Sequence, residues 1–336
     1  MHFSPTPLHI PDGFLSIAIS AVCWAITIVT LGFAISKTNK ALGEKQIPLM
    51  GVMAAFVFAA QMINFPVAGG TSGHLLGGAL ASIVLGPWAG MLVMTAVIAV
   101  QALLFQDGGL LVMGANILNM GLVTAAIGYG LYRGVVSQSK TVKLGVAGVA
   151  AWLSVMAGAL LTALQLWLSG TSQLTIVIPA MLGVHALIGL GEAFITVAAL
   201  SFILQTRPDL LGEDSESAKG GRGWVVAGGV IALAVVLLSP LASTDPDGLN
   251  HVAMDLGFFQ TAQSGVGPLA GYAVPFLNSA IASKIAAGIL GVIVAGIVAL
   301  LVGRGLKSQI ANRKPPVSNL QSSIANRKSK IVNQKS

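Results

Sequence analysis

Long apolar segments separated by short polar connections dominate the pattern of hydrophobic and polar positions along this chain. Eight such segments run at about 13–36, 47–65, 74–106, 110–132, 142–168, 175–205, 223–242 and 284–303. Most of them reach the roughly 20 residues that a helix needs to cross the hydrocarbon core of a bilayer. Because the apolar stretches are continuous and do not alternate with polar residues, they disfavour a closed β-barrel. The pattern predicts an all-α protein, a polytopic transmembrane helix bundle.

The third segment, residues 74–106, has a break near its middle. Gly86-Pro87 stands there, and this dipeptide ends a helix because proline has no N–H to continue it. We therefore expect a short helix at about 75–86 and a second one at about 88–106, so that the segment enters the membrane and returns on the same side. The number of predicted spans becomes nine, seven followed by two.

The distribution of lysine and arginine gives these spans an orientation. Basic residues gather in three connections and in the C-terminal tail, whereas the other connections between apolar segments carry none. The three basic connections hold Lys37, Lys40, Lys45, Arg133, Lys140, Lys143, Arg207, Lys219 and Arg222. Since cytoplasmic loops carry the excess of Lys and Arg, we expect the N-terminus outside and the C-terminus in the cytoplasm of a multi-pass cell-membrane protein.

The composition limits the classes of function. The chain is 55% hydrophobic and 9% charged, far below the roughly 25% charged residues of a soluble domain, which excludes an ordinary cytosolic protein. The net charge of +7 comes from eight basic residues that follow Gly303 without any acid between them. The basicity therefore belongs to a tail beside a membrane, and we expect no nucleic-acid partner.

Four parts can be separated by composition. Residues 1–206 form a seven-span domain, and the polar residues 207–222 form a cytoplasmic linker. Residues 223–303 form a two-span unit around a long outer loop, and residues 304–336 form a basic tail. Because the tail is rich in Ser, Asn and Lys, we expect it to be disordered.

Two histidines next to tight turns are the first candidates for chemistry. His74 ends the glycine-rich run Gly-Gly-Thr-Ser-Gly, and His9 precedes the turn sequence Ile-Pro-Asp-Gly. The first reading of each is a histidine that only caps or packs. The second is an all-nitrogen site shared by both, which suits Ni²⁺ or Cu²⁺ better than Co²⁺ or Zn²⁺. The single cysteine, Cys23, allows no disulfide and no cysteine-based metal site.

Polar residues within or beside the spans are the second group of candidates. His185 and Glu192 lie two turns apart on one helix and share a face, where they serve either as a proton relay or as a polar tie between helices. Asn116 and Asn119 also share a face, which predicts hydrogen bonds to the short helix. The predicted polar rim of the outer surface consists of Thr71, Ser72, Asn116, Asn119 and Asp107, together with Gln61, Asn64 and Gln101.

Long motifs in these regions resemble a known family. They are HIPDGFLS at 9–16, PVAGGTSGHLLGGALASIVLGPWAG at 66–90, QALLFQDGGLLVMGANILNMG at 101–121 and HALIGLGEAFIT at 185–196. They resemble the CbiM/NikM type of cobalt/nickel transport permease, the substrate-specific component of energy-coupling-factor ABC transporters. The stretch 243–275 resembles the PDGLE domain, which is similar to the small CbiN/NikN subunit and is here fused to the permease.

The resemblance implies a site and a set of partners. It implies that Ni²⁺ or Co²⁺ is the transported substrate, with no permanent cofactor, bound near the extracytoplasmic face by His9 and His74. It implies that His9 binds through both its backbone and its side-chain nitrogen, and that a fourth ligand stands at Leu8, in the place of the family's N-terminal methionine. It further implies two kinds of partner: a transmembrane coupling protein, and ATPase subunits that drive release into the cell.

Leu8 departs from the family pattern, because seven residues precede it. An internal Leu8 nitrogen is a peptide amide and would have to lose a proton to bind a metal ion. One hypothesis is that translation starts at position 8 from a leucine-type codon, so that this nitrogen is an amine. The alternative is that Met1-His2 supplies the amine.

The sequence therefore predicts a metal-capture subunit of a transporter and not an enzyme. The nitrogen-only site favours Ni²⁺ by the affinity order. No phosphate-binding loop and no nucleophile motif occurs in the chain. Two rival interpretations use His185 and Glu192 instead: a proton-coupled secondary metal permease, and an intramembrane enzyme. A metal sensor or docking protein is a third rival, for which nine spans are far more than needed.

Overall fold

The computed structural model describes residues 8–41, 43, 45–211, 223–263 and 267–313. Several predictions fall on residues outside these ranges. They are those for residues 1–7, for most of the linker 207–222 and for most of the basic tail 304–336. The described residues form a helix bundle with one two-stranded sheet, which confirms the all-α class. How many of the helices cross the membrane, and in which direction, remain predictions.

Helices cover each apolar segment of the first 211 residues. They are α1 (Ile17–Ala41), α2 (Gln46–Gln61), α3 (Gly78–Leu85), α4 (Pro87–Val100), η1 (Gln101–Phe105), α5 (Met113–Asn116), η2 (Ile117–Val123), α6 (Thr124–Tyr132), η3 (Arg133–Val135), α7 (Lys140–Leu168), α8 (Leu174–Thr206) and η4 (Pro208–Leu211). The turns η1 and η2 are π-helical. Such turns are widened by one residue and occur often at functional sites.

The remaining elements follow the linker. They are α9 (Gly223–Leu238), η5 (Ser239–Leu241), α10 (Gly248–Asp255), η6 (Phe259–Thr261), η7 (Ala270–Tyr272) and α11 (Ala280–Arg313). We refer to residues 223–313 as the C-terminal unit. Among the described residues, six helical segments are long and apolar enough to cross a membrane. They are 17–39, 87–105, 140–168, 174–206, 223–241 and 280–308.

The predicted break in the third segment is present. Helix α3 ends at Leu85, Gly86 has a φ of 82°, and Pro87 opens α4. A positive φ suits glycine, and proline suits the first helical position because its missing N–H has no partner there. The two helices fold back on each other so closely that a Cβ on Gly90 would lie 2.7 Å from the Cα of Ser82. The bend holds the start of α3 near the cavity described below.

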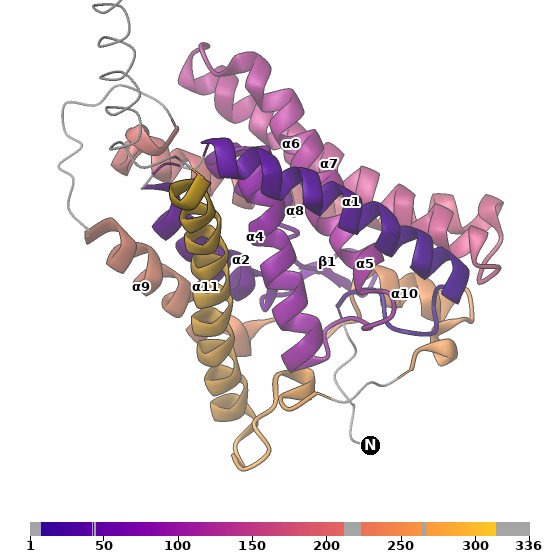
Figure 1. Cartoon of the computed structure of the whole chain (residues 1–336). Coiled ribbons are helices and arrows are strands. Elements are labelled where there is room, and N and C mark those ends of the chain that lie inside the picture. Colours follow the sequence, from indigo (N-terminus) through magenta and orange to yellow (C-terminus); the bar gives the residue numbers. More distant parts are fainter. Residues whose placement is uncertain (1–7, 42, 44, 212–222, 264–266, 314–336) are drawn as a thin grey trace, which may run out of the picture.

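The helices pack in two groups around α4 (Figure 1). On one side α7 and α8 run side by side, and on the other α9 and α11 flank α2. Small residues allow these close approaches: a Cβ on Gly51 of α2 would lie 3.1 Å from the carbonyl oxygen of Gly296 in α11. The C-terminal unit is therefore packed directly onto the helices of residues 8–211.

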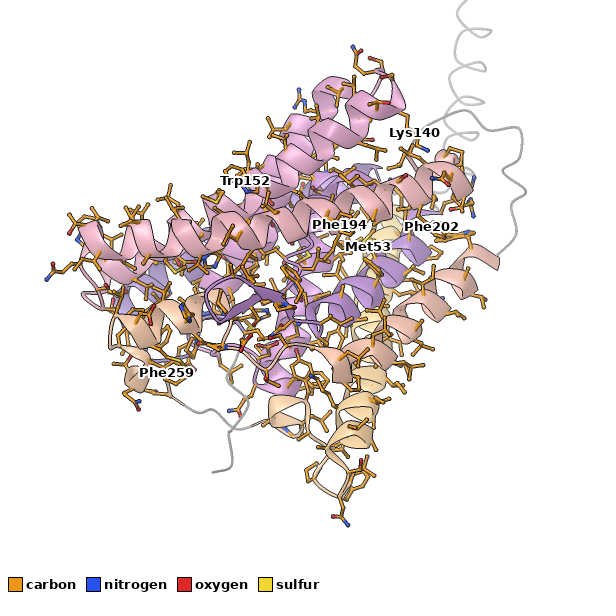
Figure 2. All side chains as sticks on the ribbon, turned by 180° about the vertical axis from the view of Figure 1, so that it is seen from behind. Met53, Lys140, Trp152, Phe194, Phe202 and Phe259 are labelled. Carbon is orange, nitrogen blue, oxygen red and sulfur yellow. The ribbon has the colours of Figure 1, made fainter. Side chains whose placement is uncertain are left out.

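Large apolar side chains cover the outside of α8. Phe194 is 76% exposed and Phe202 is 53% exposed, and Figure 2 shows both on this helix. An apolar outer face is what a helix in contact with lipid presents. Lys140, at the start of α7, and Phe259, in η6, lie at opposite ends of the molecule in the same view.

A short sheet connects the two parts of the chain. Strands β1 (Phe65–Val67) and β2 (Thr71–Gly73) pair in antiparallel fashion, with Phe65 opposite Gly73. A parallel bridge then joins Ser72 of β2 to Asp247 of the C-terminal unit. The segment that carries His74 is thus fixed from both sides by backbone pairing.

Candidate metal centre

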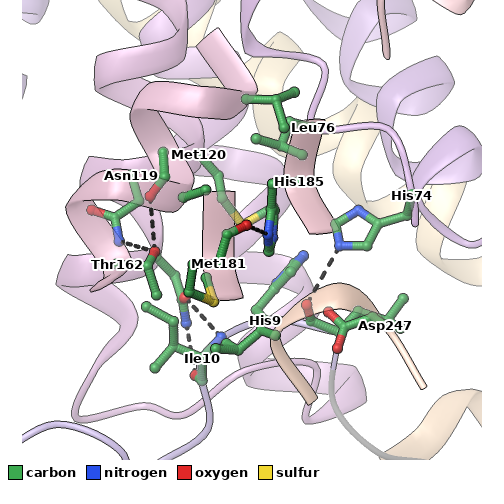
Figure 3. A pocket seen from close by; sticks show the side chains of 16 residues that line it. His9, Ile10, His74, Leu76, Asn119, Met120, Thr162, Met181, His185 and Asp247 are labelled. Carbon is green, nitrogen blue, oxygen red and sulfur yellow. Dashed lines mark hydrogen bonds between the residues drawn. The ribbon is translucent and has the colours of Figure 1, made fainter. Parts of the chain in front are cut away.

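A cavity of about 70 Å³ lies where the N-terminal segment, the loop before α3, α7, α8 and the C-terminal unit meet (Figure 3). Three imidazoles, those of His9, His74 and His185, line it together with Asp247. Its other lining residues are Leu8, Ile10, Leu76, Asn116, Asn119, Met120, Val155, Gly158, Ala159, Thr162, Met181 and Leu249. A space of this size accommodates a metal ion or a small number of waters.

His9 and His74, the two histidines of the predicted nitrogen site, lie close together. Their ring centroids are 5.5 Å apart, and the two side chains are 2% and 6% exposed. The Nδ1 of His9 is 3.0 Å from the carbonyl oxygen of Asp107, and the Nδ1 of His74 is 3.0 Å from that of Leu75. With the proton on Nδ1 in both rings, each Nε2 carries a lone pair.

The two Nε2 atoms have no better partner in the described part of the chain. The buried Nε2 of His9 has no hydrogen-bond partner there, and the Nε2 of His74 is 3.4 Å from the carbonyl oxygen of Leu8. Metal-ligating histidines commonly donate their other N–H to a carbonyl or carboxylate, which fixes the tautomer. Burial, and to a smaller extent the neighbouring His9, lower the pKa of His74. The ring of His74 therefore stays neutral and able to bind a metal ion.

Asp107 connects the N-terminal segment to the end of α4. Its Oδ1 accepts a hydrogen bond of 2.7 Å from the backbone N–H of Leu8, and its Oδ2 accepts one of 2.6 Å from the hydroxyl of Tyr272. Leu8 thus lies beside both histidines with its nitrogen held by a buried carboxylate. In the described chain this nitrogen is a hydrogen-bond donor and not a lone pair.

Asn116 and Asn119 hold the walls of the cavity. Asn116 accepts a hydrogen bond from the N–H of Ile10 and donates one to its carbonyl, both at 3.0 Å. Asn119 bonds Thr162 and Gln165 of α7. The sequence predicted that both would support the short helix α3. Their hydrogen bonds instead fix the His9 segment and α7.

His185 and Glu192 do different things although they share one helix. His185 lines the cavity, and its Nδ1 is 2.8 Å from the carbonyl oxygen of Met181 one turn earlier. Glu192 is fully buried and accepts the backbone N–H groups of Leu76 and Gly77 at 2.5 and 2.9 Å. Its carboxylate therefore holds the loop that follows His74.

The C-terminal unit contributes residues that the sequence analysis did not identify as part of this site. The hydroxyls of Thr71 and Ser72 donate to the carbonyls of Pro246 and Asp245 at 3.1 and 2.8 Å. Asp247 then caps α10 through Asn250 N–H at 2.9 Å and lines the cavity. Burial raises the pKa of Asp247 to about 8. A signal for it was present, because the Pro-Asp-Gly turn beside His9 recurs at Pro246.

The other predicted residues fall elsewhere or outside the described chain. His251 lies on α10 and pairs with Asp255 at 3.4 Å, and His2 is outside the described residues. Gln61 donates to the carbonyl of Leu76 at 2.8 Å. Within the described ranges, no three His, Cys, Asp or Glu side chains are grouped closely enough to hold a metal ion by themselves. The imidazoles of His9 and His74 are in place, and the carbonyl oxygen of Leu8 lies 3.4 Å from the Nε2 of His74.

Comparison with known proteins gives two family matches and several similar transport proteins. Residues 9–210 match the family described as the cobalt uptake substrate-specific transmembrane region, and residues 222–308 match the PDGLE domain. The chain is 30% identical to the fused nickel transport protein NikMN of Rhodobacter capsulatus, over 86% of this chain and 96% of the relative. It is 32% identical to the cobalt transport protein CbiM of Sorangium cellulosum, over 61% of this chain and 94% of the relative.

A solved structure shares the fold of the N-terminal part. A crystal structure described as that of a truncated transition metal transporter aligns with a TM-score of 0.54 and 36% sequence identity. The alignment covers 59% of this chain and 98% of the other. The share of this chain is close to that of the N-terminal match, residues 9–210.

Proposed function

Because the chain belongs to the cobalt uptake substrate-specific transmembrane family and carries a PDGLE domain, we propose that it captures Ni²⁺ or Co²⁺ at the cavity between His9 and His74. The chain is a multi-pass membrane protein for transition-metal uptake, and the metal ion is its substrate. It is not an enzyme. Our proposal concerns where the metal ion binds, what energy drives its uptake and which subunits assist the chain.

One observation carries the site. Two buried imidazoles, with ring centroids 5.5 Å apart, both have Nδ1 against a carbonyl oxygen, which leaves both Nε2 lone pairs beside one cavity. A buried lone pair without a donor is costly, and a metal ion would satisfy two of them at once. Imidazole nitrogen suits Ni²⁺, Co²⁺ and Cu²⁺, and the affinity order favours Ni²⁺ over Co²⁺.

The remaining ligands are proposed to come from the backbone around Leu8. Its carbonyl oxygen is 3.4 Å from the Nε2 of His74, and its nitrogen lies on the carboxylate of Asp107. If the protein starts at position 8, this nitrogen is an amine that Asp107 neutralises until the metal ion arrives. If residues 1–7 are retained, the carbonyl oxygen is the more available donor.

We propose that uptake is driven by separate ATPase subunits acting through a transmembrane coupling protein. The sequence has no phosphate-binding loop of its own. The rival in which His185 and Glu192 relay protons is less well supported, because both oxygens of Glu192 are occupied by backbone N–H groups. We propose that Glu192 is structural and that no proton gradient is needed.

Metal binding by the purified full-length protein tests the site. Ni²⁺ and Co²⁺ titrations are made on the wild type, His9→Ala, His74→Ala and the control His251→Ala, which changes a histidine outside the cavity. We expect stoichiometric binding by the wild type and by the control, and a loss of at least 100-fold in affinity in the other two. Unchanged binding in both cavity variants would rule out this site. Intact mass of the same samples shows whether residues 1–7 are present.

A second measurement tests the source of energy. Uptake of Ni²⁺ or Co²⁺ is followed in cells that express the chain with and without the coupling and ATPase subunits encoded by its host. We expect uptake to require those subunits and to survive a protonophore at constant ATP. Uptake by the chain alone that the protonophore abolishes would support the proton-coupled rival.

A further inference from the structure

Tyr272 of the C-terminal unit makes one hydrogen bond into the candidate metal centre. Its hydroxyl donates to Oδ2 of Asp107 at 2.6 Å, a length typical of an O–H group bound to a carboxylate. Burial and the negative charge of Asp107 raise the pKa of Tyr272 well above its usual value. The phenol is therefore neutral and remains a donor at any physiological pH.

Asp107 also makes two hydrogen bonds to the N-terminal segment that carries Leu8 and His9. Its Oδ1 holds the N–H of Leu8 at 2.7 Å, and its carbonyl oxygen accepts from Nδ1 of His9 at 3.0 Å. One residue thus fixes the position of the Leu8 backbone and the tautomer of the His9 ring. Tyr272 is the side chain that binds the remaining carboxylate oxygen.

The ring of Tyr272 is held independently of its hydroxyl. It stacks on Phe105 with centroids 4.8 Å apart and planes at 20°, and it meets Phe58 edge-on at 6.2 Å. A nearby backbone hydrogen bond, from Leu269 N–H to the Leu104 carbonyl at 2.9 Å, joins the same two segments. Removing the hydroxyl alone therefore leaves the packing of this contact in place.

The backbone on both sides of the contact is in an unusual conformation. In the described part of the chain, the two non-glycine residues with a positive φ are Gln106, at 59°, and Tyr272, at 57°. Non-glycine residues adopt this conformation at a cost, and they do so most often where a functional site requires it. Here it places the Asp107 carboxylate and the Tyr272 hydroxyl opposite each other.

We propose that Tyr272 is a positioning residue of the metal site, which acts through Asp107 to hold Leu8 and His9 ready for the metal ion. The inference rests on the proposed function, since it assumes that His9 is a ligand. It assigns the C-terminal unit a defined chemical role: the unit supplies the hydrogen bond that orients the ligand segment. Without the hydroxyl, the carboxylate of Asp107 keeps only its hydrogen bond from Leu8 N–H, so the Leu8 backbone next to His9 is held less firmly.

The test is Ni²⁺ binding by the full-length protein in detergent, measured for the wild type, Tyr272→Phe, Asp107→Asn and the double variant. Tyr129→Phe is the matched control, because it removes the same hydroxyl from a half-buried ring on α6 that does not line the cavity. Each sample is also followed by its visible Ni²⁺ absorption spectrum, which reports ligand geometry, and by its thermal unfolding midpoint.

We expect Tyr272→Phe to weaken Ni²⁺ binding by roughly tenfold, to change the visible spectrum, and to keep the unfolding midpoint of the wild type. Because Tyr272 acts through Asp107, the double variant should bind no more weakly than Asp107→Asn alone. Tyr129→Phe should match the wild type in all three measurements.

Three results would overturn the inference. The first is a Tyr272→Phe variant with the affinity and spectrum of the wild type. The second is a double variant whose loss is the product of the two single losses. The third is an affinity loss accompanied by a lower unfolding midpoint, which would make the hydroxyl merely structural. A wild type and a Tyr129→Phe control that both fail to bind Ni²⁺ or Co²⁺ would instead reject the proposed function itself.

Discussion

His9 and His74 show how much of the site can be predicted from single residues. Each histidine follows or precedes a turn made of Gly, Pro or Asp, and such turns fix a side chain near a rigid backbone. That reasoning and the resemblance pointed to both histidines, whereas Asp107 was predicted only as part of the polar rim. The Leu8 hydrogen bond to Asp107 could not be predicted, because it depends on the left-handed turn at Gln106, for which glutamine gives no signal.

The low pKa of His74 has a consequence for metal binding at acidic pH. Burial and His9 lower the pKa of His74 from its usual value of 6.5, and only the neutral ring binds a metal ion. In a protein that keeps residues 1–7, protonation of His74 competes only below that lowered pKa, so we expect it to leave the affinity for Ni²⁺ unchanged from about pH 7.5 to 6.5 and to reduce it at lower pH. Titrations at half-unit intervals measure this. A fall that already begins above pH 7 would contradict it.

Asp247 makes a second pH-dependent contribution, this time to stability. Burial raises its pKa from 3.8 to about 8. The unfolded chain then releases the proton at lower pH than the folded one, so stability contributed by the protonated group is complete below about pH 4 and is lost as the pH rises to about 8. Asp247→Asn keeps a capping oxygen for Asn250 and has no such titration.

We therefore expect the unfolding midpoint of the wild type to fall relative to that of Asp247→Asn between pH 5 and pH 8. Thermal unfolding followed by circular dichroism at both pH values measures the difference. Asp247→Ala serves as the control for the cap. Relative to Asp247→Asn, we expect it to be less stable by about 1 kcal/mol at both pH values. An equal response of the wild type and Asp247→Asn to pH would show that this carboxyl group is solvated.

At the scale of elements, the hydrophobic pattern predicted where helices form and where the third segment breaks. Gly86-Pro87 separates α3 from α4 at the expected place, because those two residues act through local backbone geometry. The π-helical turns η1 and η2 were not predicted. A one-residue widening leaves the apolar composition unchanged, yet it rotates every later side chain relative to a regular α-helix.

Close packing of α6 against α3 gives a prediction at this scale. A Cβ on Gly128 would lie 2.5 Å from the Cα of Ala79, a backbone atom that cannot move aside, whereas a Cβ on Gly130 meets nothing within 4 Å. We expect Gly128→Ala to destabilise the protein by about 1–3 kcal/mol. Gly130→Ala, on the same helix, should be neutral or stabilise by up to ~1 kcal/mol. Thermal unfolding in detergent compares them, and equal midpoints would mean that α3 and α6 are not in tight contact.

At the scale of the whole molecule, the sequence predicted a membrane bundle but not how its parts close around the site. Local patterns report which residues are apolar. They do not report that Asp247 lines a cavity formed by residues far away along the chain, or that Tyr272 bonds Asp107 beside the N-terminal segment. The distribution of lysine and arginine adds a predicted orientation of the helices across the membrane.

That orientation can be measured with introduced cysteines. Cys23 is buried and is first replaced by Ala. Ser137, in the connection before α7, and Gln260, in η6, are both exposed, and each is changed to Cys in turn. We expect a membrane-impermeant maleimide to label the Gln260→Cys variant in intact cells and the Ser137→Cys variant only after permeabilisation. The reverse pattern would invert the proposed topology.

The bridge between Ser72 and Asp247 joins two parts of one polypeptide, and that affects how the site can open. A covalent tether keeps the second part at an effective concentration in the millimolar range even when the bridge is broken. The stoichiometry of the two parts is then fixed at one to one, whatever the expression level. If this pairing opens, it re-forms in an intramolecular step and does not wait for a separate subunit to diffuse back.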